Sequence, residues 1–265
     1  MHPHDHAALA SATGLGYTSH GTGPEHVLVL HDWLGAHDTY DAVHPYLDGE
    51  RFTYVFADLR GYGHSLTLRG RYTIEEIASD CLALADRLGW QRFHLMGHSM
   101  TGMAAQRIAA DAPARIKSIV ATCPLSAAGN PLGEDALAFF ASTRDDDDAL
   151  RRLFRFVGGD LGEPWVNAKL RQQRRSVARE CVHGYLRMFT TTHFVEDVRG
   201  LATPMLVVIG DKDPGLGEEA MKATFLAWHP GARLVIMPHC GHYPMQERPP
   251  HYAQCVEGFL REHAD

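Results

Sequence analysis

The chain has 265 residues, of which 45% are hydrophobic and 22% charged, the composition of an ordinary globular protein with room for one sizeable α/β domain. The net charge of −7 argues against nucleic acid or an anionic membrane as the main partner, because both need a basic surface. No run of about 18 apolar residues occurs, so the sequence predicts no membrane span.

The N-terminal residues lack the basic and then apolar pattern of a secretory signal. Residues 1–12 are predicted to be a disordered tail, and the alternating histidines His2, His4 and His6 are read as part of that tail rather than as a metal site. The cysteines are odd in number and form no C-x-x-C pair, which predicts reduced thiols and a cytoplasmic protein. They are Cys81, Cys123, Cys181, Cys240 and Cys255.

Residues 14–23 are turn-rich and predict an edge hairpin anchored by Tyr17. Beyond them, continuous apolar runs predict strands that are covered on both faces, as in a parallel sheet. These runs are 27–30, 54–57, 93–96, 116–123, 205–209 and 234–237. Helical patterns lie between the runs, of which the first opens with a capping box from Thr73 to Glu76. The alternation predicts an α/β fold with a doubly wound, mostly parallel sheet.

The alternation is interrupted once, because residues 126–198 contain helical patterns and no strand. We therefore predict a core of residues 13–125 and 199–265, with a helical cap of residues 126–198 over the carboxyl ends of the strands. The acidic run 145–148 is read as a helix start rather than a metal site. Five basic residues of the predicted cap are read as a solvated helix face, with selection of an anionic substrate as the alternative. They are Lys169, Arg171, Arg174, Arg175 and Arg179.

The segment 95–102 links the third predicted strand to a helix and reads Leu-Met-Gly-His-Ser-Met-Thr-Gly. A serine with small residues two positions away on both sides, between strand and helix, is typical of a nucleophile elbow. The turn would hold the Ser99 hydroxyl clear of the sheet, at a helix N-terminus that favours negative charge. Thr101 stands where glycine is usual, and its branched side chain should crowd the turn slightly.

A serine hydroxyl needs a base, and the base needs an acid that orients it. His242 follows the last predicted strand closely, which makes it the candidate base. The loop after 205–209 offers two carboxylates, of which Asp213 is the candidate acid and Asp211 is expected to be solvated. An oxyanion would be held by the backbone N–H groups of Met100 and Trp33.

These motifs resemble those of the α/β-hydrolase superfamily, in particular its small esterase-like members with a helical cap. The likeness runs from about Gly14 to near the end and includes two further segments. Residues 58–65 are similar to the family's D-x-R-G-x-G-x-S motif, and Gly-His is followed by Gln-Glu-Arg-Pro at 246–249. The order Ser99, Asp213, His242 is the order of nucleophile, acid and base in that family. The resemblance implies fold and catalytic triad, but it specifies the substrate poorly.

The main departure is Asp32, because the family pattern His-Gly places glycine after His31. A carboxylate that pointed into an oxyanion hole would oppose the negative charge there. Asp32 and His31 are therefore predicted to line the oxyanion or substrate site together with Trp33 and Met100, without an assigned role.

We expect a serine hydrolase that cleaves a carboxylic ester or a lactone with a fairly apolar substrate. No metal-ligand spacing, phosphate loop or flavin fingerprint occurs, so the sequence implies no metal and no cofactor. Three alternatives stay open. They are a C–C bond hydrolase or perhydrolase on the same scaffold, a cofactor-independent ring-cleaving dioxygenase that uses the His–Asp dyad, and a binding protein on a hydrolase scaffold. The sequence does not predict the oligomeric state.

Overall fold

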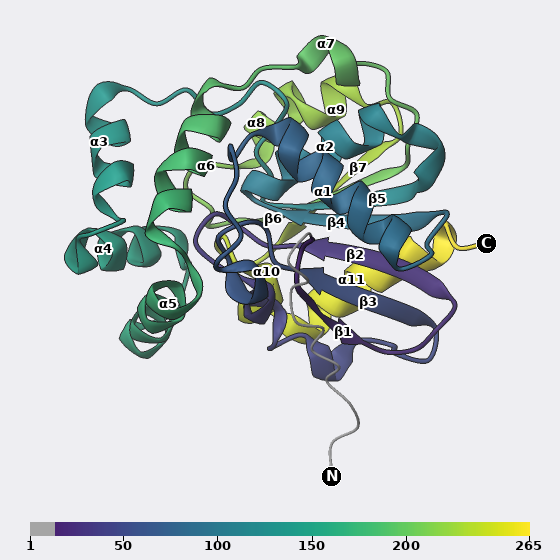
Figure 1. Cartoon of the computed structure of the whole chain (residues 1–265), viewed down its shortest axis with the longest axis horizontal. Coiled ribbons are helices and arrows are strands. Elements are labelled where there is room, and N and C mark those ends of the chain that lie inside the picture. The colour runs from purple at the N-terminus through teal and green to yellow at the C-terminus, as the bar shows by residue number, and fades with distance from the viewer. Residues whose placement is uncertain (1–13) are drawn as a thin grey trace.

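A computed structural model describes residues 14–265, which form a sheet flanked by helices (Figure 1). The predicted tail of residues 1–12 lies outside the described residues. Within residues 14–265 the sheet has seven strands in the order β1-β3-β2-β4-β5-β6-β7, and every pairing is parallel except that of β1 with β3. The strands are β1 (Tyr17–His20), β2 (Glu25–Leu30), β3 (Phe52–Ala57), β4 (Phe93–His98), β5 (Ile116–Thr122), β6 (Met205–Gly210) and β7 (Ala232–Met237).

The predicted fold class is confirmed, and all six predicted core strands are present. The predicted edge hairpin at 14–23 is wrong. β1 instead crosses to the outer side of β3 and pairs with it in antiparallel fashion, with Tyr17 opposite Ala57. The turn residues around Gly21 (φ 79°) therefore lead into β2 without forming a two-stranded ribbon.

Both faces of the sheet are covered because successive side chains of a strand point to opposite faces. In β2, Leu28 and Leu30 pack with helices on one face, whereas Val27 and Val29 pack with α11 on the other. The first face carries α1 (Ile74–Arg87), α2 (Met100–Asp111), α8 (Glu218–Ala223) and α9 (Phe225–Trp228). The second face carries α11 (Pro249–Glu262), which follows the short α10 (Pro244–Glu247).

The connections include short 3-10 helices η1 (His37–Tyr40), η2 (His44–Tyr46), η3 (Gly63–Ser65) and η4 (Pro113–Arg115). At the start of α1, the Thr73 side chain accepts a hydrogen bond from the Glu76 amide at 3.3 Å, as a capping box requires. The Glu76 carboxylate accepts from the Tyr72 amide, one residue earlier than in the usual reciprocal arrangement.

Between β5 and β6 the chain forms α3 (Glu134–Ser142), α4 (Asp147–Val157), α5 (Glu163–Ser176), α6 (Arg179–Thr191) and α7 (Val195–Val198). Figure 1 shows α3 to α6 gathered to one side of the sheet, while α7 returns to lie over α2. We call residues 126–198 the helical segment. The acidic run begins α4 as predicted, because the Asp146 carboxylate accepts from the amides of Asp148 and Ala149. Across residues 14–265, no helix combines the length and apolar character needed to cross a bilayer.

Candidate active site

Ser99 occupies a strained turn between β4 and α2. Its backbone has φ 56° and ψ −116°, in the left-handed half of conformational space that residues other than glycine rarely adopt. The neighbouring chain leaves no room for side chains. A Cβ on Gly97 would lie 2.3 Å from the Thr101 carbonyl oxygen, and one on Gly102 would lie 2.2 Å from the Pro124 Cβ. The turn is therefore as sharp as the predicted elbow.

Thr101 is accommodated in this turn by hydrogen bonds. Its hydroxyl accepts from the His98 amide at 2.9 Å, and the carbonyl oxygens of Leu30, His31 and His98 lie at 3.1, 2.9 and 3.0 Å. The side chain is fully buried. The threonine thus ties the elbow to the end of β2, a function that the glycine expected at this position could not perform.

His242 and Asp213 form a buried pair next to the elbow. The His242 Nδ1 lies 2.6 Å from the Asp213 Oδ2, and the Asp213 Oδ1 accepts from the amides of Gly215 and Leu216. Burial raises the pKa of Asp213, but His242 and these donors outweigh it and lower the pKa to about 2. Burial lowers the pKa of His242, but the carboxylates around it, Asp213 first, raise it overall. Asp211 is exposed and accepts from the Cys240 amide.

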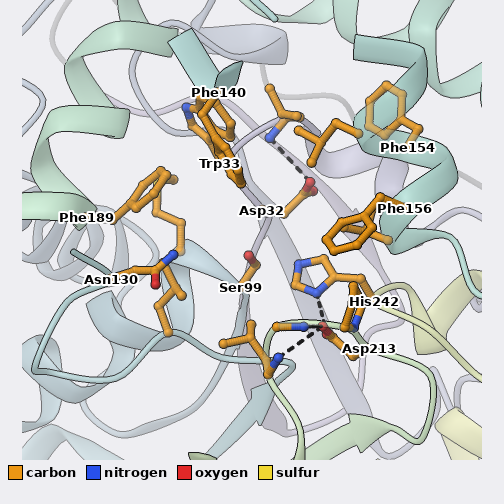
Figure 2. A pocket seen from close by; sticks show the side chains of 18 of the residues that line it. Asp32, Trp33, Ser99, Asn130, Phe140, Phe154, Phe156, Phe189, Asp213 and His242 are labelled. Atoms are coloured by element: carbon orange, nitrogen blue, oxygen red, sulfur yellow. Dashed lines mark hydrogen bonds and ion pairs between the residues drawn. The ribbon is translucent and has the colours of Figure 1, made fainter. Parts of the chain in front are cut away.

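One cavity of about 310 Å³ brings the predicted residues together. Figure 2 shows Ser99 facing the edge of the His242 ring that is turned away from Asp213. The cavity is mostly apolar, and α3, α4 and α6 supply much of its wall. These helices and the linkers next to them contribute Asn130, Leu132, Phe140, Leu153, Phe154, Phe156, Val157 and Phe189.

The predicted oxyanion loop follows β2 directly. Trp33 and Met100 both line the cavity with Ser99. Trp33 is held in place because its indole N–H donates to the Val182 carbonyl at 2.9 Å and its own carbonyl accepts from the Tyr62 hydroxyl at 2.7 Å. This binds the loop to α6 and to the segment after β3.

His31 does not reach the cavity as the described residues form it. The Leu59 amide donates to the His31 Nε2 at 3.1 Å, so the Nδ1 carries the hydrogen that is donated to the Asp32 carbonyl at 2.7 Å. Burial keeps the pKa of His31 low. The ring therefore joins the loops that follow β2 and β3. It supports the cavity wall from behind and, contrary to the prediction, does not line the cavity that the described residues form.

Asp32 lines the cavity but is directed into a buried polar cluster. Its Oδ2 accepts from the Tyr243 hydroxyl at 2.9 Å and from the Leu34 amide at 3.3 Å. The dashed line from Asp32 in Figure 2 accordingly runs to the backbone, not to Ser99 or His242. Burial raises the pKa of Asp32, but Lys169, His98 and the Tyr243 hydroxyl hold it well below its usual range. Asp32 is thus an anion at neutral pH.

Two members of this cluster had no assigned role in the sequence analysis. His98 donates from Nε2 to the His242 carbonyl at 2.7 Å, and its ring lies 5.0 Å from the His242 ring. Tyr243 follows His242 directly and places its ring 4.7 Å below the Lys169 ammonium. Burial lowers the pKa of His98 to about 3, so the ring is neutral.

Lys169 of α5 contradicts the expectation of a solvated basic face, because its side chain is only 2% exposed. It shares the buried face of α5 with Val166, Leu170 and Gln173, and this i, i+3, i+4, i+7 spacing is the signal that could have revealed it. Arg171 and Arg175 of the same helix are exposed, and Arg175 pairs with Asp38.

The helical segment meets the loop of His242 through the backbone. The His242 amide donates to the Val157 carbonyl at 2.8 Å. Glycines allow the two backbone segments to come into contact. A Cβ on Gly159 (φ 57°) would lie 2.6 Å from the Gly241 nitrogen, and one on Gly241 would lie 2.5 Å from the Gly159 nitrogen. On the other side, Glu247 of the Gln-Glu-Arg-Pro motif accepts from the amides of Gly241 and Tyr243.

Two clusters of described residues have the composition of a metal site. In one, His37 and His64 both direct their Nδ1 atoms to Asp58, at 2.8 and 3.0 Å from Oδ2. Asp58 also accepts from both histidine amides, so it anchors the D-x-R-G-x-G loop. The other cluster is Cys123 with Asp213 and His242, in which the His242 Nδ1 bonds to Asp213 and the Cys123 thiol donates to the Gly241 carbonyl at 3.8 Å. Hydrogen bonds account for both clusters without an ion.

Comparisons with known proteins identify the fold family. A family model described as the alpha/beta hydrolase fold matches residues 25–249. A pimeloyl-[acyl-carrier protein] methyl ester esterase from Nitrosomonas europaea is 28% identical over 253 residues, which cover 89% of this chain and 96% of that protein. A fluoroacetate dehalogenase from a Burkholderia species is 38% identical over 104 residues, only 37% of this chain and 34% of that protein.

Solved structures show the same fold. A bromoperoxidase from Bacillus anthracis superposes with a TM-score of 0.84 at 20% identity and covers 93% of this chain and 95% of its own. An esterase from Thermogutta terrifontis superposes with a TM-score of 0.82 at 24% identity and covers 97% of this chain and 98% of its own.

Proposed function

The chain belongs to the α/β-hydrolase fold family and is a hydrolase; from this premise we propose that it cleaves carboxylic esters through a Ser99–His242–Asp213 triad. The observation that carries the proposal is the buried Asp213–His242 pair beside a strained serine in one apolar cavity. Strain at a non-glycine residue is maintained only where the surroundings enforce it, and it concentrates at functional sites.

In the proposed mechanism, the His242 Nε2 removes the proton of Ser99 as the Ser99 oxygen attacks the ester carbonyl carbon. The backbone N–H groups of Trp33 and Met100 stabilise the negative oxygen of the tetrahedral intermediate. His242 then gives its proton to the leaving alcohol. A water molecule, deprotonated by His242, attacks the acyl-enzyme and releases the acid and free Ser99. Asp213 orients His242 and stabilises its protonated form in both halves.

We further propose that the substrate is a small ester or lactone with an apolar acyl group, and that the helical segment 126–198 acts as a cap over the site. Aromatic side chains from α3, α4 and α6 support this, since Phe140, Phe154 and Phe189 form the wall that faces Ser99. Contact with apolar atoms favours apolar ligands by about 25 cal/mol per Å² of buried surface.

The test is covalent labelling with a fluorophosphonate, followed by intact mass and peptide mapping. We expect one label per chain on Ser99, no label in Ser99→Ala, and slow labelling in Asp213→Asn. Hydrolysis of p-nitrophenyl butyrate measures turnover in the same variants. Absence of labelling in a folded protein would overturn the acyl-enzyme mechanism, and labelling at another residue would overturn the assignment of Ser99.

A further inference from the structure

The buried cluster around Asp32 lies next to the proposed base, and Asp32, His242 and Tyr243 line the same cavity. His98 contacts the His242 backbone, Tyr243 is the next residue in the chain, and Asp32 accepts a hydrogen bond from Tyr243. The chain has therefore placed a second carboxylate near His242, in addition to Asp213. This carboxylate belongs to Asp32, which occupies the position where the family pattern has glycine.

The charges of the cluster are not neutralised by direct contact. The Asp32 Oδ1 lies 3.8 Å from the His98 Nδ1, which is too long for a hydrogen bond, and the His98 Nδ1 has no hydrogen-bond partner within residues 14–265. The Lys169 ammonium is likewise buried without a hydrogen-bond partner in the described part of the chain. Its contacts are the faces of the Tyr243 and Phe154 rings, at 4.7 and 6.0 Å.

Asp32 and Lys169 form no ion pair with each other, and buried charges outside an ion pair act over longer distances, because little water screens them. We propose that Asp32 and Lys169 are positioning residues of the catalytic base: the Asp32 carboxylate stabilises the protonated His242 imidazole, and the Lys169 ammonium opposes it. This inference rests on the proposed function, in which His242 must gain and lose a proton twice in each turnover.

Every charged or titratable group that faces His242 enters this balance. Asp213 bonds to Nδ1, Glu247 holds the amides on either side of His242, and the neutral His98 contacts its carbonyl. The Cys123 thiol lies within 4.8 Å of the Asp213 and His242 polar atoms, and the Tyr243 ring lies 5.5 Å from the His242 ring. Val157 of α4 contributes only a carbonyl group. Burial lowers the pKa of His242, whereas Asp213, then Asp32 and Glu247, raise it. Lys169 is not one of these groups: it stands beside them, over the Tyr243 ring, and acts on Asp32 and His98. Asp32 and Lys169 can both be exchanged without touching the triad or its hydrogen bonds.

The experiment compares Asp32→Asn, Lys169→Met and the double variant. Asparagine keeps an oxygen acceptor for Tyr243 and removes the negative charge, and methionine keeps the length of lysine and removes the positive charge. We expect Asp32→Asn to move the acid limb of the kcat/KM–pH profile for p-nitrophenyl butyrate to lower pH, by about one unit. We expect Lys169→Met to move it to higher pH, and the double variant to return toward wild type.

Glu25→Gln, which removes a buried carboxylate at the opposite end of the sheet, is the matched control and should leave the limb in place. The same variants are titrated by NMR with ¹³C-labelled histidine, and the His242 signal is identified by its loss in His242→Gln. This readout needs no turnover, so it separates the two proposals: silence toward fluorophosphonate overturns the ester mechanism alone. Unchanged His242 titration in both single variants, or shifts in the same direction, would overturn the inference.

Discussion

Each end of the central sheet carries a buried carboxylate, a histidine and a lysine, but the two sets are arranged differently. β2 begins with Glu25 and is followed by Asp32, and the neighbouring β4 carries His94 near its start and His98 at its end. Each carboxylate–histidine pair has a buried lysine beside it, Lys117 of β5 at the amino end and Lys169 of α5 at the carboxyl end.

At the amino end every group has a direct partner. The Lys117 Nζ lies 2.8 Å from the Glu25 Oε2, the His94 Nε2 lies 3.3 Å from the same oxygen, and the His94 Nδ1 lies 2.8 Å from the Ser118 hydroxyl. At the carboxyl end the corresponding histidine nitrogen and the lysine lack hydrogen-bond partners within the described chain. Direct pairing stabilises the fold, whereas charges held apart beside a cavity project a field into it. The residue types alone therefore do not distinguish a structural cluster from a candidate functional one. The two clusters differ in whether every buried polar atom has a hydrogen-bond partner.

The largest expected difference between the two ends concerns their serines. Ser99→Ala should lower kcat for ester hydrolysis by about 10⁴-fold or more, because it removes the nucleophile. Ser118→Ala should leave kcat within about twofold of wild type and should cost about 1 kcal/mol of unfolding free energy, through its lost bond to His94. Steady-state kinetics and urea unfolding measure both quantities. Comparable losses of activity in the two variants would remove the distinction between the two ends.

The two lysines should differ in stability. Lys117→Met leaves the Glu25 carboxylate buried with its main ion pair broken, and we expect it to lower the free energy of unfolding by about 3 kcal/mol. Lys169→Met removes a buried ammonium that has no hydrogen bond to lose, but it also removes the positive charge that stabilises the buried Asp32 carboxylate, so we expect a smaller loss of unfolding free energy, about 1 kcal/mol. Urea titration of both variants at neutral pH decides this, and a larger loss in Lys169→Met than in Lys117→Met would contradict it.

Thr101 in the turn at Ser99 tests how much a buried hydrogen bond at the carboxyl end of the sheet contributes to stability. Thr101→Val preserves shape but deprives the buried His98 amide of its acceptor, and should cost about 2 kcal/mol of unfolding free energy. Thr101→Ser retains the hydroxyl and is the matched control, expected within about 1 kcal/mol of wild type. Thermal and urea unfolding would show it, and equal stability of the valine and serine variants would mean that the hydroxyl contributes no net stabilisation.

The smallest expected effect is on pH dependence. The proposed base His242 can accept a proton only when neutral, and its pKa is raised by Asp213 and the other carboxylates against the effect of burial. Activity in wild type should therefore fall as the pH decreases through a value above about 6.5, the ordinary value for histidine. A kcat/KM–pH profile with p-nitrophenyl butyrate measures it. An acid limb below the ordinary range would show that burial outweighs the carboxylates.

The sequence was sufficient to predict which residues lie at the carboxyl ends of the strands. Buried apolar runs predict parallel strands, and parallel strands bring their carboxyl ends to one edge, so Ser99, Asp213 and His242 could be placed together before their contacts were known. Their roles as a triad stay a prediction. The interruption of the helix between α8 and α9 at Thr224 could not be predicted, because its apolar spacing continues across the break.

The buried cluster could not be predicted either, because its members come from positions 32, 98, 169 and 243, and local pattern does not specify which loops meet. Lys169 carried a signal in its spacing, but lysines on helices are mostly exposed, and only the docking of α5 on Tyr243 reveals the exception. The prediction of an edge hairpin at 14–23 was wrong for a similar reason. The partner of β1 is β3, which follows β2 in the chain, and local pattern does not reveal such a distant pairing.

The contact between Gly159 and Gly241 limits how this enzyme can be rebuilt. The helical segment 126–198 is joined covalently to the rest of the fold only at its two ends, so it invites exchange as a module. The segment also contacts the rest of the fold through its backbone, because it touches the loop that carries His242 and accepts a hydrogen bond from it. A segment grafted in place of 126–198 must therefore keep a glycine at the position of Gly159, or it will push against Gly241 and displace His242.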